Sequence, residues 1–138
     1  MQGMAAAAHP PTADDLVSLG QAILKGLPEP FRGAVTDVPI MVQDWPDDAT
    51  LDGMGIDDPL DLTGLYAAVP LGERATLGAP PSEPELIHLY RLPILFEWCE
   101  RGCALEEVVF DVLTHEIGHH FGMDEEAVLR MEDREGEV

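Results

Sequence analysis

Positively charged side chains are scarce in this sequence. Its 138 residues include 7 Lys and Arg against 27 Asp and Glu, which gives a formal net charge of −20. A surface with so many carboxylates repels phosphate backbones over most of its area, so we expect no nucleic-acid partner. Apolar runs long enough to cross a bilayer are also missing, because Arg, Glu or Pro interrupts each long one. We therefore expect no membrane partner either.

Cysteine is rare as well. Cys99 and Cys103 form the only pair, and the spacing CxxxC is typical of neither a zinc knuckle nor a thioredoxin motif, so we expect two reduced thiols. The first 15 residues contain a short Ala run but neither a basic start nor a long apolar core, which argues against a signal peptide. These features together predict a soluble, cytoplasmic protein.

The length fits one domain, because two halves of this chain would each be too small for a core of their own. We expect a flexible leader over residues 1–12, a single domain over 13–131 and a charged tail over 132–138. The 13 Gly and 12 Pro predict substantial irregular connections.

Acidic side chains concentrate in residues 44–61, which hold seven Asp and no Lys or Arg. Such a run predicts an exposed loop whose charges repel one another. A calcium loop is the alternative, but the ordered spacing of Asp and Asn with a terminal Glu is absent.

Hydrophobic periodicity predicts the helices and strands. A first helix carries apolar residues from Leu16 to Leu27, with Thr12 or Asp14 as its cap. Strands are expected over residues 35–43, where Pro39 predicts an edge or a strand start, and over 64–71 and 85–92. Pro93 should begin a short helix, residues 104–121 a long one, and Asp124 should cap a last helix to Met131.

The long helix carries the pentapeptide HEIGH, from His115 to His119. Two His residues four apart lie on one helix face, so both can direct an imidazole nitrogen at a single zinc ion. Glu116 lies about 100° around the helix, where it can contact a metal-bound water without binding the metal. The pattern predicts that Glu116 acts as general base in hydrolysis by a zinc-activated water. A surface helix that carries two His by chance is the alternative.

A catalytic zinc usually has a third protein ligand. From His115 to Glu125 the sequence follows the spacing HExxHxxGxxH, with a carboxylate in place of the last His. Gly122 can adopt positive φ, end the helix and turn the chain back toward the metal. We expect Glu125 to be the third ligand, with Asp124 as the competing candidate.

These residues resemble the small bacterial zincin-like metallopeptidase family, whose motif HExxHxxGxx ends in an acidic residue. The stretches Gly64–Arg74 and Pro84–Ile94 are similar to the two strand segments that precede the family's active-site helix, so the resemblance covers roughly residues 12–126. It implies an α+β fold of the minimal zincin type, with a small mixed β-sheet packed against the active-site helix and an N-terminal helix. It also implies zinc bound by His115, His119 and Glu125, with Glu116 as the base, and a peptide or protein substrate of unspecified sequence.

Other polar residues near the motif are less convincing as ligands or catalysts. His120 points about 100° away from His119, which favours a supporting or solvent-exposed role over ligation. Tyr66 and Tyr90 could each stabilise an oxyanion, but an aromatic packed on a sheet face is the favoured interpretation.

Two other functions compete with the peptidase. A zincin-like protein that binds metal without turnover fits the small size, which leaves little protein for a deep cleft. A metal-dependent RNA hydrolase is disfavoured by the negative charge and by the Glu after His115. If the chain is a peptidase, we expect an extended peptide to pair with an exposed sheet edge at residues 65–69.

Overall fold

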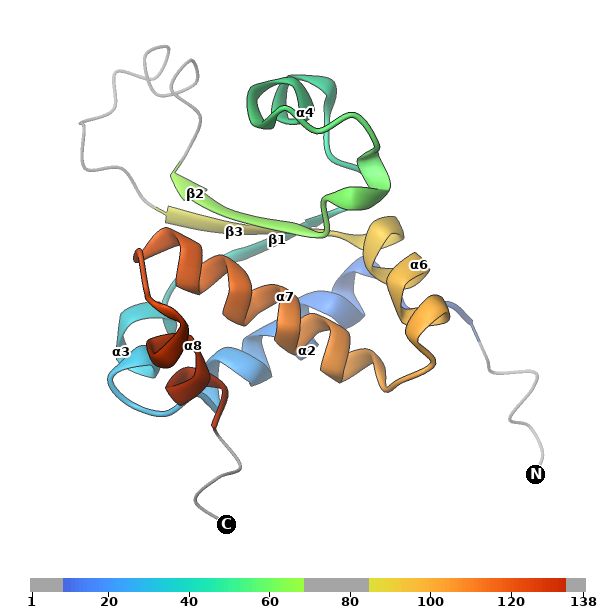
Figure 1. The fold of residues 1–138 in the computed structure, drawn as a ribbon. Helices are drawn as coiled ribbons and strands as arrows, with labels where there is room; N and C mark the ends of the chain where they lie inside the picture. The colour runs from blue at the N-terminus through green and yellow to red at the C-terminus, as the bar shows by residue number, and fades with distance from the viewer. Residues whose placement is uncertain (1–8, 69–84, 134–138) are drawn as a thin grey trace, which may run out of the picture.

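A three-stranded mixed sheet separates two layers of helices in the structure, a computed structural model that describes residues 9–68 and 85–133. The strands are β1 (Ile40–Gln43), β2 (Gly64–Ala68) and β3 (Glu85–Tyr90), in the order β1-β3-β2. β1 pairs parallel with β3, and β2 pairs antiparallel with it. Helices α2 and α7 cover one face and α4 lies over the other (Figure 1). This arrangement confirms the predicted α+β fold.

Helix α2 (Ala13–Lys25) begins at a capping box. The Thr12 hydroxyl accepts from the Asp15 backbone N–H at 3.1 Å, and the Asp15 carboxylate accepts from the Thr12 N–H at 2.8 Å. Of the two predicted caps, Thr12 is therefore the one used. The buried face of α2 packs against β1 and α7.

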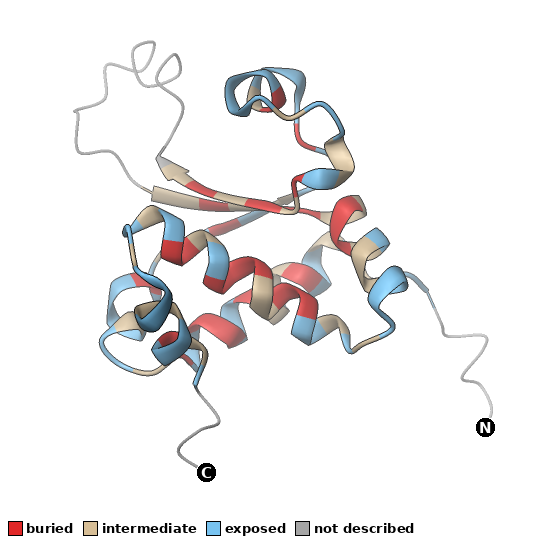
Figure 2. Ribbon diagram, in the orientation of Figure 1, coloured by how far each residue is buried: buried red, intermediate tan, exposed pale blue. Residues whose placement is uncertain are grey.

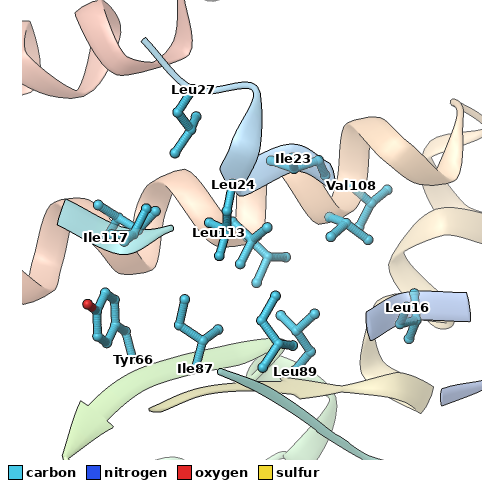
Figure 3. Close-up of a cluster of buried hydrophobic side chains, with 14 of the residues drawn as sticks. Leu16, Ile23, Leu24, Leu27, Tyr66, Ile87, Leu89, Val108, Leu113 and Ile117 are labelled. Atoms are coloured by element: carbon cyan, nitrogen blue, oxygen red, sulfur yellow. The ribbon is translucent and has the colours of Figure 1, made fainter. Parts of the chain in front are cut away.

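Helix α7 (Leu105–His120) confirms the long predicted helix to within one residue at each end. Most of its apolar side chains are buried between α2 and the sheet, as the red faces in Figure 2 and the side chains in Figure 3 show. Leu113 and Ile117 are 0% exposed, as are Ile87 and Leu89 of β3. Since each such side chain contributes about 1.5–3 kcal/mol by leaving water, this core holds α7 firmly on the sheet.

One predicted strand and one predicted helix start were wrong. Residues 35–43 do not form one strand, because Val35 ends a short helix, α3 (Phe31–Val35), and β1 starts only after Pro39. Pro93 does not begin the next helix, since α6 (Arg91–Arg101) starts two residues earlier. At the start of α6, the Arg91 Nε donates to the Pro11 carbonyl at 2.7 Å, although the two residues are 80 positions apart in the sequence. Residues 69–71 of the second predicted strand lie outside the described residues.

The acidic segment is not simply a loop. It contains α4 (Asp48–Met54) and a 3-10 helix, η1 (Pro59–Asp61). The Asp47 carboxylate caps α4 by accepting from the Thr50 N–H at 2.8 Å, and Gly55 ends it in the left-handed region at φ 69°. Leu51 packs with Leu62 and Tyr90 in a small second core. Capping and burial together offset the charge repulsion that predicted a loop.

The chain after α7 turns sharply at Gly122, which has φ 63°, and enters α8 (Glu125–Glu132). Asp124 caps α8 as predicted, by accepting from the Ala127 N–H at 2.8 Å. Helix α8 packs closely on α7, since a Cβ on Gly118 would lie 2.8 Å from a Val128 methyl. Glu132, expected in the tail, is the last residue of α8 and accepts from the Thr114 hydroxyl at 2.6 Å. None of the helices in the described ranges is both long and apolar enough to span a membrane.

Candidate active site

The second half of α7 carries the HEIGH motif into a pocket of about 330 Å³. His115, Glu116 and His119 all line this pocket, so the structure brings together three of the four predicted site residues. The remaining lining residues come from the same helix, from α6 and from the residue before β2: Thr63, Glu97, Arg101, Asp111 and Val112. Both histidines are solvent-exposed, whereas Glu116 is half-buried. The pocket can therefore receive a solute at the imidazoles while its carboxylate is partly shielded from water.

His115 is held by a hydrogen bond to the backbone of its own helix. Its Nδ1 lies 2.8 Å from the Asp111 carbonyl oxygen. Because a carbonyl can only accept, Nδ1 carries the proton and the neutral ring has Nε2 as its unprotonated nitrogen. A bond of this kind, from one ring nitrogen to a carbonyl, commonly orients histidines that bind zinc through the other nitrogen.

The environment of Glu116 raises the pKa of its carboxyl group above the ordinary value. Burial is the largest cause, and it outweighs the charges of His119 and His115 and the backbone N–H of Tyr66, all of which lower the pKa. A carboxylate with a raised pKa is a stronger base than an exposed one. Glu116 therefore binds a proton more tightly than an exposed glutamate does, and it lies in the pocket with the two imidazoles.

The predicted third ligand is not brought to the histidines. Glu125 is exposed in the first turn of α8 and does not line the pocket. Within residues 9–68 and 85–133, no three His, Cys, Asp or Glu side chains converge as a metal-binding group. The chemistry of the donors nevertheless fits zinc, because two imidazoles one turn apart, one of them oriented by a carbonyl, face an open pocket.

A model of the family described as zincin-like metallopeptidase matches residues 35–135, most of the chain. The chain belongs to this zincin-like metallopeptidase family. The match includes the sheet, α7 and α8, and starts after α2. No curated protein matches the chain.

His120 of this zincin-like chain belongs to a separate cluster beside the pocket. Its ring stacks on Tyr66, with the centroids 3.9 Å apart and the planes at 1°. Both residues donate to one carboxylate, the Tyr66 hydroxyl to Glu85 Oε1 at 2.8 Å and His120 Nε2 to Oε2 at 2.6 Å. His120 therefore hydrogen-bonds to Glu85 and does not line the pocket, as its angle on the helix predicted.

The same cluster decides how Tyr66 and Glu85 titrate. Burial raises the pKa of the Tyr66 hydroxyl, and its bond to Glu85 raises it further. Burial alone would raise the pKa of Glu85, but the bonds from Tyr66 and His120 lower it overall. Tyr66 is 5% exposed and Tyr90 is 2% exposed, in line with the packing roles expected for them. Glu85 was not among the predicted site residues, because it is 35 residues from His120 and no local pattern links the two.

Arg101 was also missed, although it lines the pocket. Its guanidinium donates to Glu97 Oε2 at 3.0 Å and to Asp111 Oδ2 at 2.9 Å, which ties α6 to the helix of the motif. The ion pair between Glu97 and Arg101 could have been predicted, because the two residues are four apart in a predicted helix. The pairing with Asp111 depends on how the helices pack.

Proposed function

We propose that this protein is a zinc-dependent peptidase in which Glu116 is the general base. The observation that carries the proposal is the shared pocket: His115, Glu116 and His119 line one open cavity in a chain that belongs to a metallopeptidase family. His115, His119 and Glu125 would hold the ion. A bound zinc ion supplies Lewis acidity toward a peptide carbonyl and lowers the pKa of a bound water.

The protein's own residues would then move the proton. The Glu116 carboxylate accepts a proton from the attacking water and afterwards donates it to the leaving amine nitrogen. Its raised pKa makes this carboxylate a stronger base toward the attacking water than an exposed glutamate would be. The Asp111 carbonyl keeps His115 in the tautomer whose Nε2 is available.

Glu125 remains our choice for the third ligand over Asp124. One oxygen of Asp124 already accepts from the Ala127 N–H at the start of α8. Using Asp124 as a ligand would compete with that cap, whereas the Glu125 side chain is exposed. The turn at Gly122 is the feature that brings the chain back toward α7 after the motif.

The peptide substrate would pair with β2, which is an edge of the described sheet. Thr63 accepts from the Tyr90 N–H at 3.0 Å, so by alternation Leu65 and Ala67 also bond to β3. The N–H groups of Tyr66 and Ala68 then point to the open side. The Tyr66 N–H lowers the pKa of Glu116, so the open edge of β2 adjoins the proposed base.

Metal analysis and peptide cleavage together test this proposal. We expect wild type and Glu116→Gln to hold about one zinc per chain, and His119→Ala to lose it. Wild type should cleave a mixed peptide library, Glu116→Gln should cleave it about 10²–10⁴-fold more slowly, and His119→Ala should not cleave it. His9→Ala, at an exposed His far from the motif in sequence, is the matched control and should retain both properties. Full activity of Glu116→Gln would eliminate Glu116 as the base.

A second candidate is a zincin-like protein that binds metal without hydrolysing anything. It is favoured by the separation of Glu125 from the histidine pair, since a third donor is not in place among the described residues. This candidate predicts that chelation lowers the melting temperature of wild type while no peptide is cleaved under any condition.

A further inference from the structure

A second cavity, of about 490 Å³, adjoins the candidate active site. Its lining residues come from α6, from η1 and the residue before it, and from Thr63 just before β2. Helix α6 lies at the end of the sheet where β2 begins (Figure 1). Thr63, Glu97 and Arg101 line both this flanking cavity and the pocket of the motif. The two hollows are therefore neighbours with a common wall. A cavity of this volume is large enough for a side chain or a small ligand.

The lining of the flanking cavity combines negative charge with apolar surface. Four carboxylates line it: Asp58, Asp61, Glu97 and Glu100. Arg101 is the one basic residue among its described lining residues, and it is already paired with Glu97 and Asp111. The apolar part includes Phe96, which is 47% exposed.

A metal ion is a poor match for this lining. The carboxylates do not converge on one point, since no three acidic, His or Cys side chains of the described residues form a metal-binding group. A Lys or Arg side chain matches both properties. Its aliphatic stem can lie on Phe96 while its charged head is attracted by several carboxylates at once, and a guanidinium can also stack on the aromatic face.

We propose that the flanking cavity is a specificity subsite that takes a Lys or Arg side chain of a peptide bound at His115, Glu116 and His119. This inference rests on the proposed peptidase function, because it assumes that a peptide occupies the pocket of the motif. It adds a substrate class, namely peptides with a basic residue near the scissile bond. Asp61 and Glu100 line only the flanking cavity, so they can be changed without touching the proposed catalytic residues.

The test measures binding and cleavage separately on the full chain loaded with zinc. A single Lys is scanned along an otherwise neutral peptide, and the best peptide is remade with norleucine or Glu in place of Lys. Dissociation constants come from fluorescence anisotropy in about 0.15 M salt, where the Debye length of about 8 Å suppresses long-range attraction. We expect wild type to bind the Lys peptide about tenfold more tightly than the norleucine peptide, with the Glu peptide weakest.

The variant Asp61→Asn/Glu100→Gln should reduce that preference to about twofold. Asp37→Asn/Glu107→Gln is the matched control, because it also removes one Asp and one Glu charge, but from exposed positions outside the cavity lining. It should keep the tenfold preference. If the control loses the Lys preference equally, the net charge of the protein attracts the peptide and the subsite is overturned. If wild type binds the Lys and norleucine peptides equally well, the cavity recognises only apolar surface and the subsite is also overturned. Circular dichroism confirms that both variants fold.

Cleavage of the same peptides separates this inference from the proposed function. Lys-dependent binding that the cavity variant abolishes, without cleavage, supports the subsite and refutes the peptidase. Cleavage without a Lys preference supports the peptidase and overturns the subsite. Absence of both binding and cleavage overturns both.

Discussion

The two faces of α7 differ in what they bury and in what they offer to solvent. On one face, Val108, Leu113 and Ile117 are fully buried against α2 and the sheet. On the other, His115 and His119 are exposed in an open pocket, with the half-buried Glu116 beside them. One helix thus anchors the fold and presents the chemistry, and the anchored face limits the movement of the exposed one. Substitutions on the two faces should therefore affect different measurements.

The largest effect on stability should come from the buried face. Leu113→Ala should lower the free energy of unfolding by about 2–5 kcal/mol, because it leaves a cavity in the main core. His119→Ala, on the exposed face of the same helix, should change it by less than about 0.5 kcal/mol in the metal-free protein. Urea unfolding of both variants measures the difference. Similar losses in both would show that the two faces are not energetically distinct.

The next largest effect separates two neighbouring acidic residues. Glu125→Ala should weaken zinc binding by at least about a hundredfold and leave stability almost unchanged, because the side chain is exposed. Asp124→Ala should do the opposite: a loss of about 1 kcal/mol of stability from the missing cap of α8, with zinc retained. Zinc titration and thermal unfolding on the same samples check both. If Asp124→Ala loses zinc and Glu125→Ala does not, the assignment of the third ligand is reversed.

A smaller effect concerns the edge of the sheet next to Glu116. Ala68→Pro removes an N–H that points to the open side, so it should weaken binding of an extended peptide by about fivefold, the value of one hydrogen bond. Zinc content should not change. Ala67→Pro is the contrasting variant, because it removes a bond to β3 and should destabilise the fold instead. Unchanged peptide binding by Ala68→Pro would argue against pairing along β2.

The smallest effect is a pH dependence of stability that comes from Glu116, beside the exposed histidines. The pKa of Glu116 is raised in the folded, metal-free protein, so the folded state binds this proton more tightly than the unfolded state does. The resulting stability is present below the ordinary pKa of 4.5 and is lost as pH rises through the raised value. Glu116→Gln should lack this loss. Metal-free wild type should therefore become less stable relative to Glu116→Gln between about pH 4 and neutrality, as denaturant unfolding can measure.

Local signals predicted the helix of the motif, its end at Gly122 and the cap at Asp124. The stripe of α7, the positive φ of a glycine and the Asp N-cap all depend on residues within one or two turns. The match to the zincin-like metallopeptidase family over residues 35–135 agrees with the resemblance that the motif from His115 to Glu125 indicated. The position of His120 beside the pocket also followed from helix geometry alone.

Tertiary packing decided the features that sequence analysis missed. Helix α4 is stabilised by burial of Leu51 against Leu62 and Tyr90, the second of which is 39 positions away in the numbering. The shared carboxylate of Glu85 joins two elements that have no local relation. The flanking cavity exists only because η1 and α6 lie together. No pattern in a single sequence shows such contacts.

The close approach of α8 to Gly118 has a consequence for the motif itself. In a pattern written HExxH the two middle letters are treated as free choices. Here the second of them is filled by the one residue without a side chain, in a helix interior where glycine costs roughly 1 kcal/mol relative to alanine. Any larger residue would push against a Val128 methyl, which would have to shift, in the helix that begins with Glu125. For this chain the informative pattern is HExGH, and its glycine links the two histidines to the position of their expected partner.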